Sequence, residues 1–190
     1  MPRGVSPPNP PLADDTIRLE PLAQAHAVEF AEIVKDAEIK RYTRVPSGAG
    51  GAFVRDWLGR YESGWIDGSR AGFCIRGAED GVFYGFAAIV QLDLATGEGE
   101  IGYMVAPAAR GRGVSARAVE LLTRWGFDEL GLERLELRID VMNAASVRIA
   151  ERAGYRLDGV LRNVHFKEGL RCDTGVWSRL RTDDPVRSTV

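Results

Sequence analysis

Residues 107–122, "PAARGRGVSARAVELL", alternate two arginines with two glycines and then pass directly into the apolar spacing of a helix. A strand is expected to end at Val105 and a helix to begin near Val114, so this stretch is a tight strand-to-helix turn. The first N–H groups of a helix have no partner within it, and the helix dipole is positive there. Glycine lets the backbone approach a ligand closely. The turn therefore predicts an anion cradle, with Arg110 and Arg112 adding charge at its rim.

The sequence before this turn predicts antiparallel strands preceded by helices. The sequence after the turn predicts helices and strands that alternate along the chain. Before the turn, apolar residues at helical spacing predict helices over residues 23–34 and roughly 52–64. Alternating segments divided by short turns predict strands over 16–22, 72–77, 82–93 and 98–105, and the last three are typical of a meander. After the turn, helices are expected over 114–130 and 144–153, and strands over 134–140, 155–166 and 173–180.

Composition limits the domain organisation and the partners. With 190 residues, 45% of them hydrophobic, we expect one domain over residues 15–181, a Pro-rich disordered or extended arm over 1–14, and a tail over 182–190. A formal charge of −2 excludes a global basic field for nucleic acid or a membrane surface. The N-terminal prolines interrupt any signal-peptide core, and no apolar run approaches the ~20 residues of a membrane span. The protein is expected to be cytoplasmic.

The cysteine pattern gives no sign of a metal site. Cys74 and Cys172 lie far apart in the sequence, without a C-x-x-C spacing or a cluster of metal ligands nearby. Such isolated cysteines are typical of reduced thiols in a cytosolic protein. We therefore expect neither a disulfide nor a bound metal.

Two nucleotide-binding motifs compete for the turn. A P-loop requires Gly-Lys-Ser/Thr, and no lysine lies near this stretch. A dinucleotide-binding fingerprint fits better, because Gly111, Gly113 and Ala116 match G-x-G-x-x-A and Asp140 ends the next predicted strand. In that fold, however, the first glycine follows its strand almost directly, whereas five residues separate Val105 from Gly111 here. An antiparallel meander before the turn and barely 50 residues after the second strand also argue against it.

Three segments in order resemble the GNAT superfamily of acetyl-CoA-dependent N-acetyltransferases: "EIGYMVAPAARGRGVSARAVELL", "LELRIDVMNAASVRIAERAGYRLDG" and "LRNVHFKEGLRCDTGVWSRL". The resemblance covers residues 17–180 and is most specific for the ribosomal-protein N-terminal acetyltransferase branch, which is RimJ/RimL-like. It implies an α+β fold with a mixed, mostly antiparallel, V-splayed sheet of about seven strands flanked by helices. In this family the pantetheine arm of the coenzyme lies in the splay and bonds to strand backbone as an extra strand would.

The same resemblance implies which residues bind acetyl-CoA. The family's pyrophosphate motif falls on Arg110, Gly113 and Ser115, and its Asn-x-x-Ser motif falls on Asn143 and Ser146. Asn143 contacts the pantetheine in this interpretation, and a simple helix N-cap is the alternative. The implied set of coenzyme-binding residues is Met104, Val105, Arg110, Gly111, Arg112, Gly113, Val114, Ser115, Asn143 and Ser146.

Three residues are candidates for the chemistry that this resemblance implies. Glu100 lies on the same strand face as Met104 and would take the amine proton directly or through water, with a surface glutamate as the alternative. Ser146 would stabilise the departing thiolate, or else bond local backbone as first-turn serines do. His165 would be a base or an acceptor contact, whereas a lone strand histidine is more often structural.

The expected reaction is acetyl transfer to a primary amine. An α-amine with a pKa near ~7.8 is about 10% neutral at pH 7, whereas a lysine at ~10.4 is neutral less than ~0.1% of the time, so a site without a strong base suits the α-amine. A protein N-terminus is therefore the leading acceptor, with a small-molecule amine such as an amino sugar as one alternative and a non-catalytic acyl-CoA-binding regulator as another.

The sequence says less about the residues that surround the acceptor amine and about the oligomeric state. The loop "KRYTRVPSGAGG" and the helix that carries Phe53, Trp57 and Tyr61 on one face are expected to line the acceptor side, with plain core packing as the alternative for this face. The resemblance and the long strands predicted near the C-terminus favour a homodimer.

Overall fold

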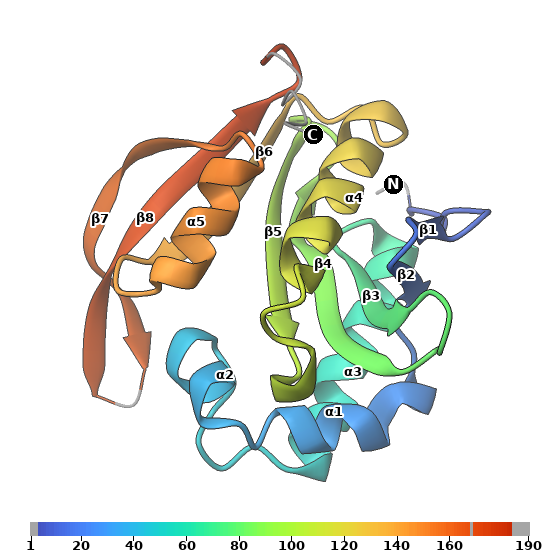
Figure 1. Ribbon diagram of the computed structural model, residues 1–190. Helices are drawn as coiled ribbons and strands as arrows, with labels where there is room; N and C mark the ends of the chain where they lie inside the picture. Colours follow the sequence, from blue (N-terminus) through green and yellow to red (C-terminus); the bar gives the residue numbers. More distant parts are fainter. Residues whose placement is uncertain (1–3, 168, 184–190) are drawn as a thin grey trace.

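The computed structural model describes residues 4–167 and 169–183 of the chain. These residues form one eight-stranded sheet in the order β1-β2-β3-β4-β5-β6-β8-β7, with helices packed on both faces (Figure 1). The sheet has one strand more than the roughly seven expected from the sequence. The strands are β1 Leu12–Ala13, β2 Ile17–Pro21, β3 Ala71–Gly77, β4 Phe83–Asp93, β5 Glu98–Val105, β6 Arg134–Asp140, β7 Arg156–Lys167 and β8 Leu170–Leu180.

The neighbouring strands β5 and β6 are parallel, and every other neighbouring pair is antiparallel. Their pairing covers only residues 98–100 of β5 against 134–136 of β6. Beyond Glu100 and Glu136 the strands separate, although β5 stays paired with β4 as far as Val105 and β6 stays paired with β8 as far as Asp140. The sheet is therefore splayed into a V, which confirms the expected mixed, mostly antiparallel arrangement.

The helices are α1 Ala27–Ile33, α2 Ala37–Tyr42, α3 Gly51–Asp67, α4 Val114–Asp128 and α5 Ala144–Arg152, with short 3-10 turns η1 Gln24–His26 and η2 Pro107–Ala109. The helix predicted over residues 23–34 is thus divided between η1 and α1. The sequence pattern did not predict α2, which the Asp36 side chain caps by accepting a hydrogen bond from the Ile39 N–H. A helix of six residues is too short to show an apolar period, so capping and tertiary contacts define it.

Two apolar cores lie on opposite faces of the sheet because successive strand residues point to opposite sides. In β4, Ala87 and Ile89 pack in the cluster that contains the buried residues of α4. Their neighbours Phe86 and Ala88 pack instead with the buried residues of α1 and α3. Figure 1 shows α4 and α5 in front of the sheet and α3 behind it. Each face of the sheet is therefore closed by its own helices, and the splay connects the two sides.

The described part of the N-terminal arm packs against the domain. Val5 is buried, and its N–H donates a hydrogen bond to the Trp65 carbonyl at 2.9 Å. The strand β1 pairs with β2, and the Asp14 carboxylate lies 3.0 Å from the Arg117 guanidinium. The described residues of the arm, from residue 4 on, therefore contact the domain that is expected to begin at residue 15. Most of the expected tail over 182–190 lies outside the described residues.

No helix within residues 4–167 and 169–183 has both the length and the apolar character needed to cross a bilayer. In the same residues, no group of three or more His, Cys, Asp or Glu side chains is placed to hold a metal ion. Both cysteines are free thiols, with Cys74 buried and Cys172 half-buried.

Candidate active site

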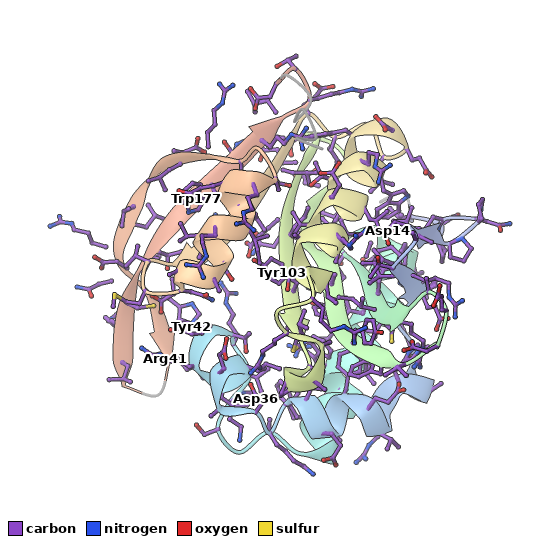
Figure 2. All side chains as sticks on the ribbon, viewed as in Figure 1. Asp14, Asp36, Arg41, Tyr42, Tyr103 and Trp177 are labelled. Atoms are coloured by element: carbon purple, nitrogen blue, oxygen red, sulfur yellow. The ribbon has the colours of Figure 1, made fainter. Side chains whose placement is uncertain are left out.

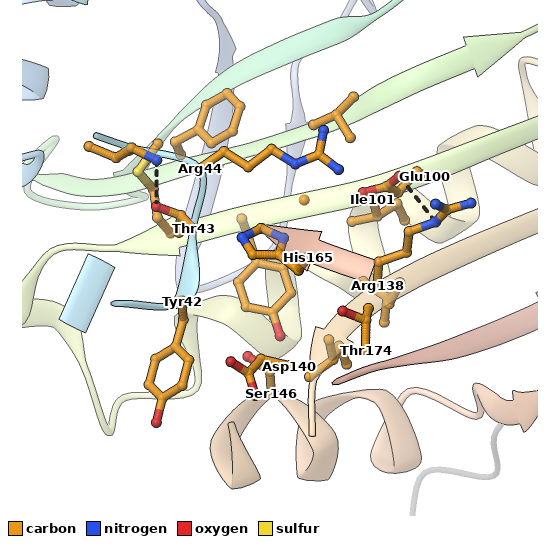
Figure 3. Close-up of a pocket in the computed structure, with 18 of the residues that line it drawn as sticks. Tyr42, Thr43, Arg44, Glu100, Ile101, Arg138, Asp140, Ser146, His165 and Thr174 are labelled. Atoms are coloured by element: carbon orange, nitrogen blue, oxygen red, sulfur yellow. Dashed lines mark hydrogen bonds and ion pairs between the residues drawn. The ribbon is translucent and has the colours of Figure 1, made fainter. Parts of the chain in front are cut away.

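A cavity of about 620 Å³ occupies the splay between β5 and β6. Its walls come from both diverging strands, the segment from α2 to α3, the first turn of α5 and the β7–β8 hairpin. Five of the residues selected from the sequence line it together: Glu100, Met104, Asn143, Ser146 and His165. Figure 3 shows several of these side chains pointing into one space. The fold therefore brings these residues from three separate segments, β5, the start of α5 and β7, to a single site.

The two sides of this cavity receive different side chains of β5. Glu100, Gly102 and Met104 alternate onto the face that α1 and α3 cover, whereas Tyr103 points to the opposite face and packs against the α4 core. A bulge in β4 lies beside this segment, because Ile89 pairs with Ile101 and the next register pair joins Gln91 to Glu100. Bulges of this kind re-aim side chains next to active sites.

Glu100 is a partly buried carboxylate, and its buried oxygen Oε2 lacks a hydrogen bond from the described residues. Its side chain is 14% exposed, and its Oε2 lies 3.6 Å from Nε of Arg138. That oxygen accepts no hydrogen bond from any described residue. Burial raises the pKa of Glu100, while the charges of Arg138 and Arg44 oppose this shift. The structure thus excludes a surface glutamate and presents a carboxylate with raised proton affinity to the cavity.

Ser146 and Tyr103 bring two hydroxyl groups together on the other side of the splay. Ser146 stands in the first turn of α5, and Figure 3 shows it at the cavity. The Tyr103 hydroxyl is buried beside it, although no described group meets it with full hydrogen-bond geometry. Burial raises the pKa of Tyr103 to about 12, against a smaller lowering by Ser146. Tyr103, labelled in Figure 2, is not among the residues selected from the sequence, because strand alternation places its side chain on the face opposite to Glu100 and carries no further signal.

Asn143 caps the helix that carries Ser146. Its side-chain oxygen accepts a hydrogen bond from the Ser146 N–H at 3.1 Å. This is the simple N-cap that the sequence left open as an alternative. Because Asn143 also lines the cavity, the cap holds the start of α5 against the splay and fixes the position of the Ser146 hydroxyl.

His165 lies centrally in the cavity, between Arg44 and Asp140 in Figure 3. Its position on β7 follows a register shift between Leu161 and His165, where the strand departs from regular pairing with β8. Burial and the Arg44 charge lower the pKa of His165, with Asp140 acting in the opposite direction. This lowering of the pKa favours the neutral form of the ring, which can accept a proton or a hydrogen bond.

The turn that precedes α4 has the backbone expected of an anion cradle. Gly111 and Gly113 have φ values of 74° and 75°, in the left-handed region that favours glycine. Gly113 is the N-cap of α4 and supplies no side-chain hydrogen bond to the helix. A Cβ atom built on either glycine meets nothing within 4 Å, so this surface is open. Val114 points inward and is buried, while Ser115 is partly exposed.

Both arginines of the turn, which are expected from the sequence to add charge at its rim, contact other groups of the protein in this structure. Arg110 forms ion pairs with Asp36 and Glu38. The guanidinium of Arg112 lies 4.7 Å from the centroid of the Tyr84 ring and donates a hydrogen bond of 2.9 Å to its hydroxyl. The cradle consists of backbone groups in this structure. Its residues lie beyond the end of β5 and are not among those that line the cavity.

A family model described as an acetyltransferase (GNAT) domain matches residues 16–156. The chain belongs to the GNAT acetyltransferase family. A Bacillus subtilis (strain 168) relative, "Putative ribosomal N-acetyltransferase YdaF", is 29% identical over 154 residues, covering 81% of this chain and 76% of that protein. The structure of RimL, a ribosomal L7/L12 α-N-protein acetyltransferase in complex with coenzyme A, has a TM-score of 0.81 at 17% identity and covers 90% of this chain and 96% of its own. Spermidine N-acetyltransferase from Vibrio cholerae, with CoA and spermine, has a TM-score of 0.78 at 17% identity over 88% of this chain and 97% of its own.

This GNAT family member is an N-acetyltransferase, so the expected enzyme class and the α+β fold are confirmed, and the ribosomal N-acetyltransferases among its relatives are in line with the expected RimJ/RimL-like branch. The dinucleotide-binding alternative for the turn is excluded, because that fold requires a mostly parallel sheet. Here β5 and β6 are parallel over only three residue pairs, and the other strand pairs are antiparallel.

Proposed function

We propose that this enzyme transfers an acetyl group from acetyl-CoA to the α-amine of a protein N-terminus. The observation that carries the proposal is the splay itself, where β5 presents Glu100 to one side and Tyr103, beside Ser146, to the other. An amine and a thioester that enter from opposite sides would meet beside the same strand. Bringing two reactants together in this way removes much of the entropic barrier of a bimolecular reaction.

The residues present fit a coenzyme A molecule. Residues 101–105 of β5 have no strand partner on the β6 side, so an extended pantetheine arm can pair with them as an added strand. The open turn at Gly111 and Gly113, followed by the uncapped start of α4, suits a pyrophosphate. Acetyl-CoA supplies the acetyl group as a thioester. The binding set proposed here is that of the sequence analysis, with Arg110 and Arg112 contributing only if they leave their present partners.

Each residue of the site has a distinct task in this reaction. Glu100 takes the amine proton, directly or through a water molecule, and its raised pKa makes it a stronger base than an exposed glutamate. The N–H groups of Met104 and Val105 are the candidates to stabilise the negative oxygen that forms on the acetyl carbonyl. Ser146 donates a hydrogen bond to the departing thiolate. His165, whose pKa is lowered by burial, contacts the acceptor, and it is the rival candidate for the base.

An acceptor panel tests the proposal and separates it from the two alternatives. Thiol release is measured with acetyl-CoA and either N-terminal peptides or small amines, including amino sugars. Turnover of peptides supports the proposal. Turnover of only the small amines would show instead that the enzyme acetylates a small-molecule amine. Acetyl-CoA binding without turnover of any acceptor would indicate a regulator.

Ser146→Ala should lower kcat about tenfold, because a hydrogen bond to the leaving thiolate is lost in the transition state. The acidic limb of the pH profile should stay in place, since Ser146 does not titrate in this range. Steady-state kinetics measures both quantities. Ser63→Ala removes an exposed hydroxyl from α3 and is the matched control. An unchanged kcat in Ser146→Ala would reject the thiolate role.

The predicted homodimer has a candidate surface on β7. Exposed apolar side chains gather along this edge strand, namely Leu157, Val160, Leu161 and Val164, each 41–49% exposed. We predict a species of twice the 20.8 kDa chain mass by sedimentation at tens of micromolar. The double substitution Val160→Glu with Val164→Glu should shift it to the monomer. A monomer alone in the unsubstituted protein would refute the prediction.

A further inference from the structure

The side chains that line the cavity carry an excess of positive charge. Among the described residues that line it, five are arginines and two are carboxylates: Arg41, Arg44, Arg60, Arg70 and Arg138 against Glu100 and Asp140. The arginines come from α2, the following loop, α3, the segment before β3, and β6. They are therefore far apart in the sequence, and the fold alone collects them around one space.

Most of these guanidiniums lack a carboxylate partner within the described residues. Arg138 is held by Glu136 at 2.7 Å and lies 3.6 Å from Glu100. The other four arginines form no ion pair with any described residue. Arg70 lies over the Tyr61 ring at 5.6 Å, and Arg41 lies over the Tyr42 ring at 5.0 Å, whereas Arg44 and Arg60 have neither an ion pair nor a ring contact.

One of the unpaired charges, that of Arg44, acts on Glu100 itself, and two more act on the neighbouring Tyr61 hydroxyl. Arg60 and Arg70 both act electrostatically on the Tyr61 hydroxyl, and so does Glu100, which places all of them around that group. Arg44 acts on both Glu100 and His165. Figure 3 shows the Arg44 side chain extending across the cavity above His165, in the direction of Glu100. Arg44 and Arg138 thus act directly on the proposed base, and Arg60 and Arg70 line the same cavity without a carboxylate partner among the described residues.

This arrangement favours acceptor molecules that carry negative charge. A cavity lined by one sign of charge concentrates the opposite charge, and guanidinium matches carboxylate or phosphate in paired hydrogen bonds. A polyamine would bring further positive charge into the same space. The guanidiniums would also lower the pKa of an amine bound beside them, because a like charge disfavours the protonated form. More of that amine would then be the neutral nucleophile.

We propose that the acceptor carries a carboxylate or phosphate close to its amine, and that Arg44, Arg60 and Arg70 bind this anionic group while the amine faces Glu100. The inference rests on the proposed acetyl transfer and narrows its substrate class. For an N-terminal peptide, the anionic group is an acidic side chain at the second or third residue. For a small acceptor, it is a carboxylate or phosphate on the same molecule. Polyamines are poor acceptors.

The test uses peptides that differ only in charge. Three peptides begin Ser-Glu-Glu, Ser-Gln-Gln or Ser-Lys-Lys and are otherwise identical, and they are assayed beside spermidine, a free amino acid and an amino-sugar phosphate. We expect kcat/KM for the Glu peptide to exceed that for the Gln peptide at least fivefold, with the Lys peptide and spermidine below both. Salt should reduce the preference, because the charges lie near solvent.

Variants assign the preference to the cavity. The ratio of the Glu to the Gln peptide should fall to about one in Arg60→Gln/Arg70→Gln, and Arg60→Glu/Arg70→Glu should favour the Lys peptide. Arg55→Gln removes the same charge from an exposed position of α3 outside the cavity and should keep the original ratio. Because the readout is a ratio within one variant, a change in overall rate does not affect it.

The outcomes separate this inference from the proposed function. Equal use of the Glu and Gln peptides, or a preference for Lys or spermidine, overturns the anionic acceptor while acetyl transfer stands. Turnover of the small anionic acceptors without any peptide upholds the charge selection and replaces the N-terminal substrate. A folded, acetyl-CoA-binding protein that uses no acceptor in the panel contradicts both.

Discussion

Glu100→Gln should lower kcat/KM about 100-fold at neutral pH, while acetyl-CoA affinity stays close to that of the unsubstituted enzyme. The substitution keeps the shape of the side chain and removes its basicity, and a positioned base contributes typically ~10²–10⁴-fold. Activity in the unsubstituted enzyme should fall as the pH drops through the pKa of Glu100. Because burial raises that pKa, this acidic limb should lie above the ordinary glutamate value of 4.5. Steady-state kinetics across pH, with calorimetry for the coenzyme, measures both effects.

Two companion variants make this result specific. Glu98→Gln changes an exposed carboxylate on the same face of β5, outside the cavity, and should leave the profile unchanged. His165→Ala removes the rival base. If His165→Ala alone abolishes the acidic limb and Glu100→Gln leaves it intact, the base is His165. If neither variant alters the limb, the amine enters already neutral and the enzyme acts by alignment.

Elements with a long apolar period could be predicted from the sequence, and short ones could not. The strand β6 was predicted over 134–140, as observed, and α5 differs from its predicted range by one residue. The strand β1 has two residues, and its existence depends on pairing with β2. The helix α2 depends on its Asp36 cap and on packing. Local periodicity carries no signal for contacts of this kind.

The same distinction applies to the site. Alternation along β5 correctly put Glu100 on the face of Met104, and the Asn-x-x-Ser motif led to Ser146 at the splay. The partners of Arg110 and Arg112 could not be foreseen, because Asp36 lies 74 residues away and Tyr84 lies 28 residues away in the sequence. A motif fixes the backbone of a turn through its glycines. The direction of a long charged side chain depends on which distant groups the fold brings within reach.

Gly113→Val should weaken acetyl-CoA binding at least tenfold, or about 1.4 kcal/mol. At a φ of 75° a side chain with a branched Cβ is strained, so the turn must shift and its N–H groups no longer converge. The added side chain would also occupy the open face that the pyrophosphate approaches in the proposed complex. Calorimetry with acetyl-CoA measures the affinity, and thermal unfolding shows whether the variant is folded.

Gly131→Val is the matched control for this prediction. Gly131 follows the other end of α4, has a φ of 70°, and likewise has no atom within 4 Å of an added Cβ. Both substitutions therefore impose a similar backbone strain of roughly 1–2 kcal/mol on the fold. Only Gly113 lies at the proposed cradle, so Gly131→Val should lose stability to a similar extent and keep its affinity for acetyl-CoA. Equal losses of affinity in both variants would trace the effect to general strain, and unchanged affinity in folded Gly113→Val would remove the coenzyme from this turn.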